Sequence, residues 1–333
     1  MAAEIKPANI AELDSIVYLI ILESEEHRGH LISRSEFSLI EVPMFAITGI
    51  SGQVGGAVAR TLIQNGKKIK AVVRDKKRAE EWAGKGCEAA IADIYDADAL
   101  NEAFRGVEGV FALFPPVFDP KPDFPEARKI AVALKSAIEK AHPRRVVYLS
   151  TIGADAGETN LLTQHTIVEG ALRDLPVPVT FLRAAWFMEN ALWDVPSARN
   201  EGVLNSFLQP LNRAVPMIAT ADIGKLAAQL LTETWKGSRV VELEGPARYS
   251  PIDLARVFSL ALGHPVRAQA VPRDSWESLF RAQGIENPMP RIRMLDGLNE
   301  GWIEFNRGVA SSRKGATELQ TVISSLVARP GAS

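Results

Sequence analysis

The sequence predicts an α/β protein of the doubly wound type, in which a parallel sheet carries helices on both faces and a small, mainly helical lobe follows at the C-terminal end. Three observations support this prediction. From Met44 onward, short apolar runs of strand length alternate with segments of helix length. The glycine-rich turn Gly49-x-x-Gly52-x-x-Gly55 directly follows the first apolar run. The segments between runs are long enough for the crossover helices that parallel strands require.

The first half of the pattern indicates five strands joined by four helices. Gly66 and Gly86 each follow a helical segment, where a residue that tolerates a left-handed backbone often ends a helix. Asp96 precedes another helical segment and is a favourable N-cap residue. The expected strands are residues 45–49, 68–74, 87–93, 109–116 and 144–151, and the expected helices are residues 55–66, 75–86, 96–107 and 125–142.

After the fifth strand the units become longer and less regular. Thr220 or Asp222 is expected to cap one helix. Another helix has a well-formed start, with Ser250 as the cap, Pro251 at the first position and Asp253 two residues later. The expected helices are residues 165–175, 220–233, 249–263, 274–284 and 315–327, and the expected strands are residues 178–187 and 239–246.

These elements divide the chain into three parts. Residues 1–43 mix acidic residues with one apolar run and do not continue the alternation, so we expect an appended extension or a helix packed on the domain. Residues 44–245 carry the alternating pattern and form the doubly wound domain. Residues 246–333 form most of a C-terminal substrate lobe, and parts of residues 186–215 are further candidates for it.

The composition argues against several classes of function. The chain has 333 residues, a formal net charge of −2 and one cysteine, Cys87. This charge provides no basic field, so no direct nucleic-acid partner is expected. No apolar run reaches the roughly 18 residues of a membrane span, and a lone cysteine suits a reducing compartment. We therefore expect a cytoplasmic protein, monomeric or homodimeric, that has no membrane association and binds a small molecule.

The glycine-rich turn indicates a site for the phosphates of a dinucleotide. Gly49 permits a tight turn, Gly52 lets the backbone approach a pyrophosphate, and Gly55 packs the following helix against the strand. The start of that helix offers free N–H groups and a partial positive charge. A P-loop is excluded because no Gly-Lys-Ser/Thr follows. The residues of the turn expected to bind the cofactor are Thr48, Gly49, Ser51, Gly52, Gln53, Val54 and Gly55.

The end of the second strand favours NADP(H), with NAD(H) as the alternative. An NAD site usually places an acidic residue there to bind the ribose 2′-hydroxyl, whereas this strand ends at Arg74, with Lys77 nearby. A guanidinium suits a 2′-phosphate through paired charge-assisted hydrogen bonds. In the alternative, these cations form an exposed helix start and Asp75 binds the ribose. Asp93, which ends the third strand, accepts a hydrogen bond from the adenine amino group or caps the next turn.

The Tyr-x-x-x-Lys pair of short-chain dehydrogenases is absent from the sequence. The residues four positions after the four tyrosines are Leu22, Ala99, Ile152 and Asp253. The corresponding helix instead carries His165-x-x-x-Glu169, whose side chains share one helix face. His165 is the expected catalytic residue, which donates a proton to a reduced oxygen or hydrogen-bonds the nicotinamide ribose or amide. Alternatively, it only lines a cleft. Two ligands do not make a metal site, so no metal is expected.

The cleft for the reacting groups is expected beyond the carboxyl ends of the strands. Phe114, Pro115 and Thr151 are expected beside the cofactor. The residues expected beside the substrate are Pro116, Ile152, Trp186, Phe187 and Asn190, with Met188 extending a flat apolar surface. Residues 114–127 contain five prolines and form either a lid or a rigid surface loop.

Several motifs together resemble the NmrA-like family of atypical short-chain dehydrogenase/reductases, from about Met44 to at least Gly245. They are "ITGISGQVGG", "AVVRD", "VVYLSTIGAD", "HTIVEGAL", "TFLRAAWFMEN" and "ATADIGKLAAQLL". The resemblance implies a Rossmann domain with a small C-terminal lobe, and it places the glycine turn and Arg74 at cofactor positions. By the same resemblance, His165 in place of tyrosine matches the quinone-reductase branch. Residues 1–43 have no counterpart in the family pattern.

Two functions are compatible with these residues. The family includes NADPH-dependent quinone reductases and azoreductase-like proteins, and also corepressors that bind NAD(P) without turning it over. The first function is therefore an NADPH-dependent oxidoreductase that reduces a quinone or a similar conjugated acceptor by hydride transfer. A quinone accepts hydride readily, so the reaction needs little acid assistance and suits a site without the Tyr–Lys pair. The alternative is a non-catalytic NAD(P)-binding redox sensor that acts through a protein partner.

Overall fold

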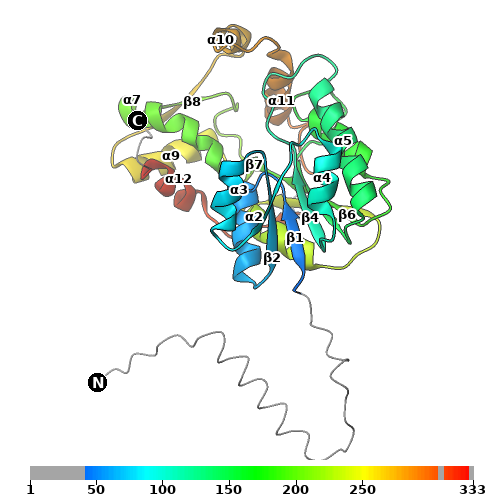
Figure 1. The fold of residues 1–333 in the computed structure, drawn as a ribbon. Coiled ribbons are helices and arrows are strands. Elements are labelled where there is room, and N and C mark those ends of the chain that lie inside the picture. The colour runs from blue at the N-terminus through cyan, green and yellow to red at the C-terminus, as the bar shows by residue number, and fades with distance from the viewer. Residues whose placement is uncertain (1–41, 307–310, 330–333) are drawn as a thin grey trace, which may run out of the picture. The chain divides into compact units, whose positions relative to one another are not determined.

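The central sheet has eight parallel strands in the order β13-β10-β6-β5-β4-β1-β2-β3. Figure 1 shows β1, β2, β4 and β6 of this sheet. The computed structural model describes residues 42–306 and 311–329. The strands of this sheet are β1 (Met44–Ile47), β2 (Lys68–Val73), β3 (Glu88–Ile91), β4 (Gly109–Leu113), β5 (Val146–Thr151), β6 (Val179–Ala184), β10 (Ser238–Glu244) and β13 (Arg313–Lys314). The run from β3 to β6 has the strand order of the Rossmann fold. The predicted fold class is therefore confirmed.

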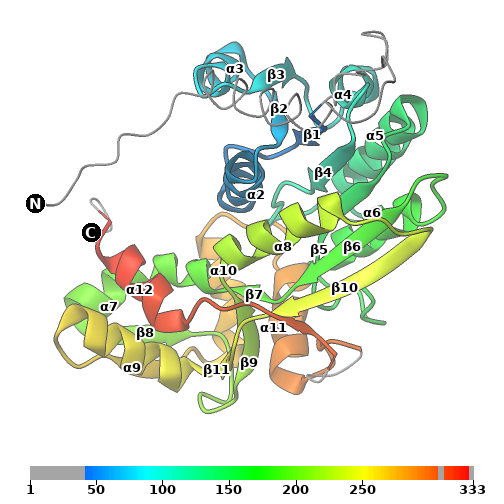
Figure 2. The same cartoon turned by 90° about the horizontal axis from the view of Figure 1, so that it is seen from below.

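Both faces of the sheet are buried under helices. On β5, Val146 and Tyr148 belong to one hydrophobic core, whereas Val147 and Leu149 belong to the other, because successive side chains of a strand point to opposite faces. Figure 2 shows α2 and α8 together on one face and α4, α5 and α6 on the other. These helices are α2 (Gln53–Gln64), α4 (Ala97–Phe104), α5 (Pro125–Ala141), α6 (Thr163–Leu172) and α8 (Thr220–Thr232).

The strand order reverses between β1 and β4, and this reversal positions the site. Helix α2, which follows β1, packs on one face through Val58, and helix α3 (Lys76–Ala83) packs on the same face through Trp82. The helices before and after β4 pack on the other face, through Phe104 and Leu134. The loops that leave β1 and β4 therefore diverge at the carboxyl ends of the strands, which opens a crevice between them.

The C-terminal lobe contains helices and two small sheets, of orders β11-β9-β7 and β12-β8. Its helices are η1 (Met188–Asp194), α7 (Val195–Glu201), α9 (Pro251–Leu262), η2 (Arg273–Ser275), α10 (Trp276–Ala282), α11 (Met289–Glu300) and α12 (Leu319–Val327). Its strands are β7 (Trp186–Phe187), β8 (Val203–Ser206), β9 (Val215–Ile218), β11 (Arg248–Tyr249) and β12 (Arg267–Ala270). Most of these strands were not expected, because runs of two to four residues are too short to show an alternating pattern.

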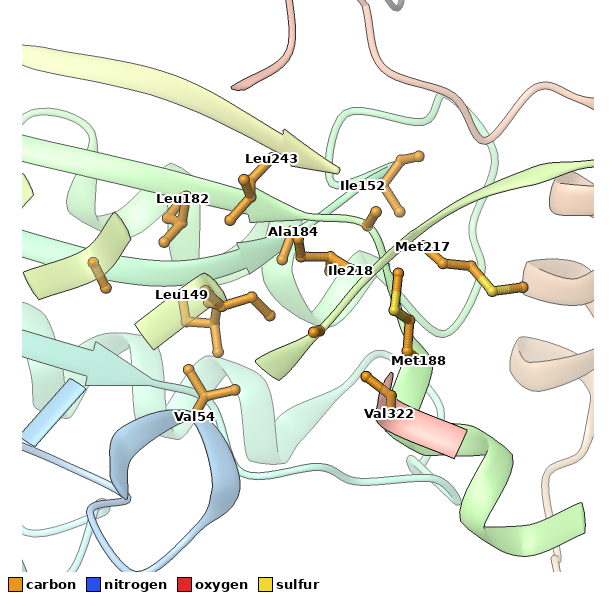
Figure 3. Packing of buried hydrophobic residues seen from close by; sticks show 14 of the residues in the cluster. Val54, Leu149, Ile152, Leu182, Ala184, Met188, Met217, Ile218, Leu243 and Val322 are labelled. Atoms are coloured by element: carbon orange, nitrogen blue, oxygen red, sulfur yellow. The ribbon is translucent and has the colours of Figure 1, made fainter. Parts of the chain in front are cut away.

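The lobe and the large sheet share one hydrophobic core. Met188, Met217 and Val322 come from η1, β9 and α12, and Figure 3 shows them in the same cluster as Leu149 and Leu182. The strand β13, which lies beyond residue 245, also pairs with β10 of the large sheet. Residues on both sides of the expected division at residue 245 therefore share the large sheet and one hydrophobic core.

The start of helix α9 and the N-terminal segment were also the subject of predictions. The start of α9 is confirmed, because the Ser250 hydroxyl accepts a hydrogen bond from the Asp253 N–H and the Asp253 carboxylate accepts one from the Ser250 N–H. The expected extension, residues 1–43, lies outside the described residues except for Val42 and Pro43. Within residues 42–306 and 311–329, no helix is both long and apolar enough to cross a bilayer.

Candidate cofactor and substrate site

A cavity of about 710 Å³ opens at the carboxyl ends of β1, β2, β4 and β5. It occupies the crevice at the reversal of strand order, where this type of fold binds its ligands. The residues expected beside the cofactor that line it are Thr48, Gly49, Ser51, Gly52, Gln53, Val54, Gly55, Arg74, Asp93, Phe114, Pro115 and Thr151. Lys77, also expected there, lies in the first turn of α3 and does not line the cavity.

The glycine turn has the geometry that a close approach to phosphate requires. Gly49 has a φ of +59°, which an L side chain rarely adopts. A Cβ on Gly55 would lie 2.3 Å from the Gly49 carbonyl oxygen, so only glycine lets α2 begin this close to the turn. Gly52 is the N-cap of α2 and has no side chain to accept from the first N–H groups. These groups therefore remain available to an anionic ligand.

Two arginines line the end of the cavity beside β2. Arg74 was expected there, and Arg78, four residues later in the first turn of α3, was not. Asp75, the alternative ribose ligand, instead caps α3: its Oδ1 accepts a hydrogen bond of 2.9 Å from the Arg78 N–H. Asp75 does not line the cavity. The position that decides between NAD and NADP therefore presents guanidinium groups in this structure.

The neighbouring part of the cavity is mainly apolar. Asp93 lies at its edge, and its Oδ1 accepts a hydrogen bond of 2.9 Å from the Tyr95 N–H, which is the capping role given as one alternative. The Tyr95 ring is half exposed and lines the cavity with Ile94 and Leu100. This surface suits a flat ring system, and Tyr95 was not identified from the sequence.

His165 lines the inner part of the cavity and is bound to a buried tyrosine. The Tyr148 hydroxyl lies 3.0 Å from His165 Nδ1, and Phe114 packs edge-on against the imidazole. Burial lowers the pKa of His165 to about 4, although the nearby Glu169 carboxylate opposes this shift. The imidazole is therefore neutral near pH 7 and can act as a hydrogen-bond donor or acceptor but not as an imidazolium acid.

Glu169 shares the helix with His165 but is used elsewhere. Its carboxylate accepts hydrogen bonds from the Ser150 hydroxyl at 2.6 Å and from Arg183 at 2.8 and 3.0 Å. Arg183 also pairs with Asp155. A buried carboxylate needs such partners, so Glu169 serves the packing of β5, β6 and α6. The His165-x-x-x-Glu169 spacing therefore does not form a hydrogen-bonded pair.

The carboxylate of Glu189 joins η1 to α8 at the edge of the cavity. It accepts hydrogen bonds from the Thr220 N–H at 2.9 Å and from the Thr220 hydroxyl at 2.6 Å. The expectation that Thr220 or Asp222 caps α8 is wrong, because the N-cap position belongs to Ala219 and Glu189 supplies the capping oxygen from a distant segment. Glu189 and Thr220 both line the cavity.

The expected substrate wall is present in part. Pro116, Phe187 and Asn190 line the cavity. Ile152 is 3% exposed and packs in the core, and Trp186 packs against that core. These two side chains, and that of the buried Met188, do not line the cavity. The wall also includes Leu192 and Trp193, which were not expected. The result is an apolar surface with one amide.

The proline-rich loop, residues 114–127, is hydrogen-bonded to other segments of the protein at Val117 and at Asp119. The Val117 carbonyl accepts a hydrogen bond of 3.0 Å from Gln164. The Asp119 carboxylate accepts hydrogen bonds from the backbone N–H groups of Glu286 and Asn287 at 3.0 and 2.7 Å. These anchors favour the rigid-loop alternative over a lid that moves freely.

Comparison with known proteins identifies the family. The model of the NmrA-like family matches residues 43–308. The chain belongs to the NmrA-like family. Among curated relatives, quinone oxidoreductase 2 of Escherichia coli is 27% identical over 290 residues, which cover 86% of this chain and 94% of that protein. The NAD(P)H azoreductase of Xenophilus azovorans is 28% identical over 260 residues, 77% of this chain and 85% of that one.

Solved structures share the fold of this protein over most of the chain. The NADPH-dependent quinone oxidoreductase of Escherichia coli, complexed with NADPH, has a TM-score of 0.72 and 24% identity, and covers 85% of this chain and 99% of its own. A Citrobacter triphenylmethane reductase complexed with NADP(H) has a TM-score of 0.70 and 20% identity over 86% and 99% of the two chains. The match of the family model to residues 43–308 confirms the family membership predicted from the sequence motifs.

Among the cavity residues missed by sequence reasoning, Arg78 carried a usable signal. It belongs to the same run of charged residues as Arg74, four positions later, although Arg74 precedes the Asp75 cap and lies outside α3. Trp193 follows Asn190 by three residues in the short helix η1, whose geometry the sequence did not show. The contact between Glu189 and Thr220 spans 31 residues and has no local signal. Within the described residues, no cluster of metal ligands is present.

Proposed function

We propose that this NmrA-like protein is an NADPH-dependent reductase whose acceptor is a quinone or a similar conjugated small molecule. The observation that carries the proposal is one continuous cavity, which joins the glycine turn, two arginines, a neutral histidine and an apolar wall. The names of the two curated relatives, a quinone oxidoreductase and an NAD(P)H azoreductase, support the same class of reaction.

The residues at the turn and at β2 fit NADPH. The uncapped start of α2 would hold the pyrophosphate, because the close contact of Gly55 with Gly49 brings free N–H groups to the cavity. Arg74 and Arg78 would hold the 2′-phosphate through charge-assisted hydrogen bonds. When bound, NADPH supplies a hydride to the acceptor.

The residues at the inner end would orient the acceptor. Phe187, Leu192 and Trp193 provide a flat apolar surface on which a conjugated ring can lie. His165 would hydrogen-bond the acceptor oxygen, on which negative charge develops as the hydride arrives. Because the imidazole is neutral, the proton that completes the hydroquinone comes from water, and the reduction consumes one hydride and one proton for each electron pair transferred.

The test is turnover by the purified full-length chain with NADPH and a panel of benzoquinones and naphthoquinones. We expect loss of the reduced-nicotinamide absorbance that depends on both protein and quinone, and a lower kcat for His165→Gln. Tight binding of NADPH without turnover on any acceptor would refute the proposal. That outcome would favour the sensor alternative, which predicts different affinities for NADPH and NADP+ and a protein partner.

A further inference from the structure

Tyr148 is a buried tyrosine that the proposed reaction does not use directly. It lies on β5 with 0% of its surface exposed and packs edge-on against Phe181 of the neighbouring strand. Its hydroxyl reaches across to α6 and lies 3.0 Å from His165 Nδ1. Among the described residues, this is the only hydrogen bond of the Tyr148 hydroxyl.

Burial decides the direction of this hydrogen bond. A phenol O–H that is removed from water must donate its proton, since an unpaired buried donor is costly. Within residues 42–306 and 311–329, the one hydrogen-bond partner of this hydroxyl is Nδ1 of His165. A nitrogen that accepts this bond carries no proton, so in the neutral imidazole the proton lies on Nε2.

We infer that Tyr148 is a positioning residue, which holds His165 in the tautomer that presents an Nε2–H donor to the cavity. The effect of this positioning on catalysis rests on the proposed function, whereas the tautomer of His165 does not. Aromatic contacts limit the rotation of the imidazole: the Phe114 and His165 ring centres lie 5.6 Å apart, and those of Tyr148 and His165 lie 6.0 Å apart. The donor is therefore fixed in direction before an acceptor arrives.

The surroundings argue against Tyr148 as a proton source. Burial raises the pKa of Tyr148 well above its usual range, and the Glu169 carboxylate raises it further. A relay that left a tyrosinate in the core would place a second negative charge near Glu169. Glu169 is already paired with Arg183, whose guanidinium is shared with Asp155. The Tyr148 proton therefore stays on the phenol and serves to orient His165.

The test combines a spectroscopic and a kinetic measurement. Nitrogen NMR of histidine-labelled protein reports the tautomer, and His165→Gln identifies the His165 signals among those of the five histidines. In the wild type we expect the Nε2–H tautomer between about pH 6 and pH 8. In Tyr148→Phe, which keeps the ring and removes the hydroxyl, we expect a mixture of tautomers. We also expect kcat to fall about tenfold with little change in KM.

A matched control separates positioning from general loss of packing. Thr180 lies on the neighbouring strand, is also 0% exposed, and its hydroxyl accepts from Arg239 rather than contacting His165. Thr180→Val is expected to keep both the tautomer and kcat. An Nδ1–H tautomer in the wild type, or the same tautomer and kcat in Tyr148→Phe, would overturn the inference. If the tautomer changes in Tyr148→Phe while no quinone is reduced by the wild type, the positioning role stands and the proposed function fails.

Discussion

The low pKa of His165 predicts a specific loss of stability in mild acid. The folded protein holds the imidazole neutral, with a pKa of about 4, whereas an unfolded chain has a histidine pKa of about 6.5. Between these two values the unfolded state binds more protons than the folded state. Lowering the pH through this window therefore favours unfolding, and raising it restores stability. His165→Gln removes the titration, and glutamine can still accept a hydrogen bond from Tyr148.

The size of the effect follows from the two pKa values. Proton linkage gives a loss of about 2 kcal/mol between pH 7 and pH 5 for a group whose pKa falls from 6.5 to about 4. A folded pKa one unit higher would still give about 1.5 kcal/mol, because at pH 5 most of the effect comes from protonation of the unfolded chain. His165→Gln should lack this contribution, whatever its stability at pH 7.

The assay is urea unfolding of wild type and variant at pH 7 and pH 5. The quantity compared is the change in unfolding free energy between the two pH values, so a constant cost of the substitution cancels. His142→Asn is the control for removal of an imidazole that does not line the cavity, and asparagine suits the left-handed backbone of that position (φ of 47°). An equal loss of unfolding free energy in wild type and His165→Gln would refute the reasoning, and with it the neutral state of His165 in the folded protein.

Four further predictions concern the cavity and one helix start. Arg74→Ala combined with Arg78→Ala should weaken NADPH binding at least about tenfold and NADH binding little, as measured by calorimetry; equal losses would contradict the 2′-phosphate role. Gly55→Ala should weaken both dinucleotides at least about tenfold, because its Cβ would meet the Gly49 carbonyl, whereas Gly170→Ala, with open space around it, should not. Trp193→Ala should raise KM about fivefold for a naphthoquinone without lowering kcat; an unchanged KM would remove Trp193 from the substrate wall. Ser250→Ala should lower the free energy of unfolding by about 1 kcal/mol, and thermal melts of equal midpoint would contradict the capping box.

Local sequence signals predicted the parts of the molecule that depend on local physics. The alternation of strand and helix lengths predicted β1 to β6, because strands buried on both faces are short apolar runs. The spacing of Gly49, Gly52 and Gly55 predicted the geometry of the glycine turn, because a positive φ and a close helix approach each require glycine. The Ser250 start of α9 was predicted on the same basis, since both capping partners lie within one turn.

Side-chain partners that lie far apart in the chain were decided only by the tertiary structure. The sequence places His165 and Glu169 on one helix face, but packing turns Glu169 toward Arg183, because a buried carboxylate must be paired with a charge. The sequence offers no sign that Tyr148 on β5 would bind His165 on α6, since that contact depends on how the helix packs against the strand. The capping of α8 by Glu189 has the same origin.

The sequence by itself determined the fold class, the glycine turn and the cationic end of β2, because each rests on backbone geometry or charge within a few residues. Only the tertiary structure decided that Arg78 joins Arg74 at the cavity, that Asp75 is used as a helix cap, and that His165 is neutral and bound to Tyr148. Burial and long-range packing set these properties, because they fix which polar groups lose water and which partners remain to replace it.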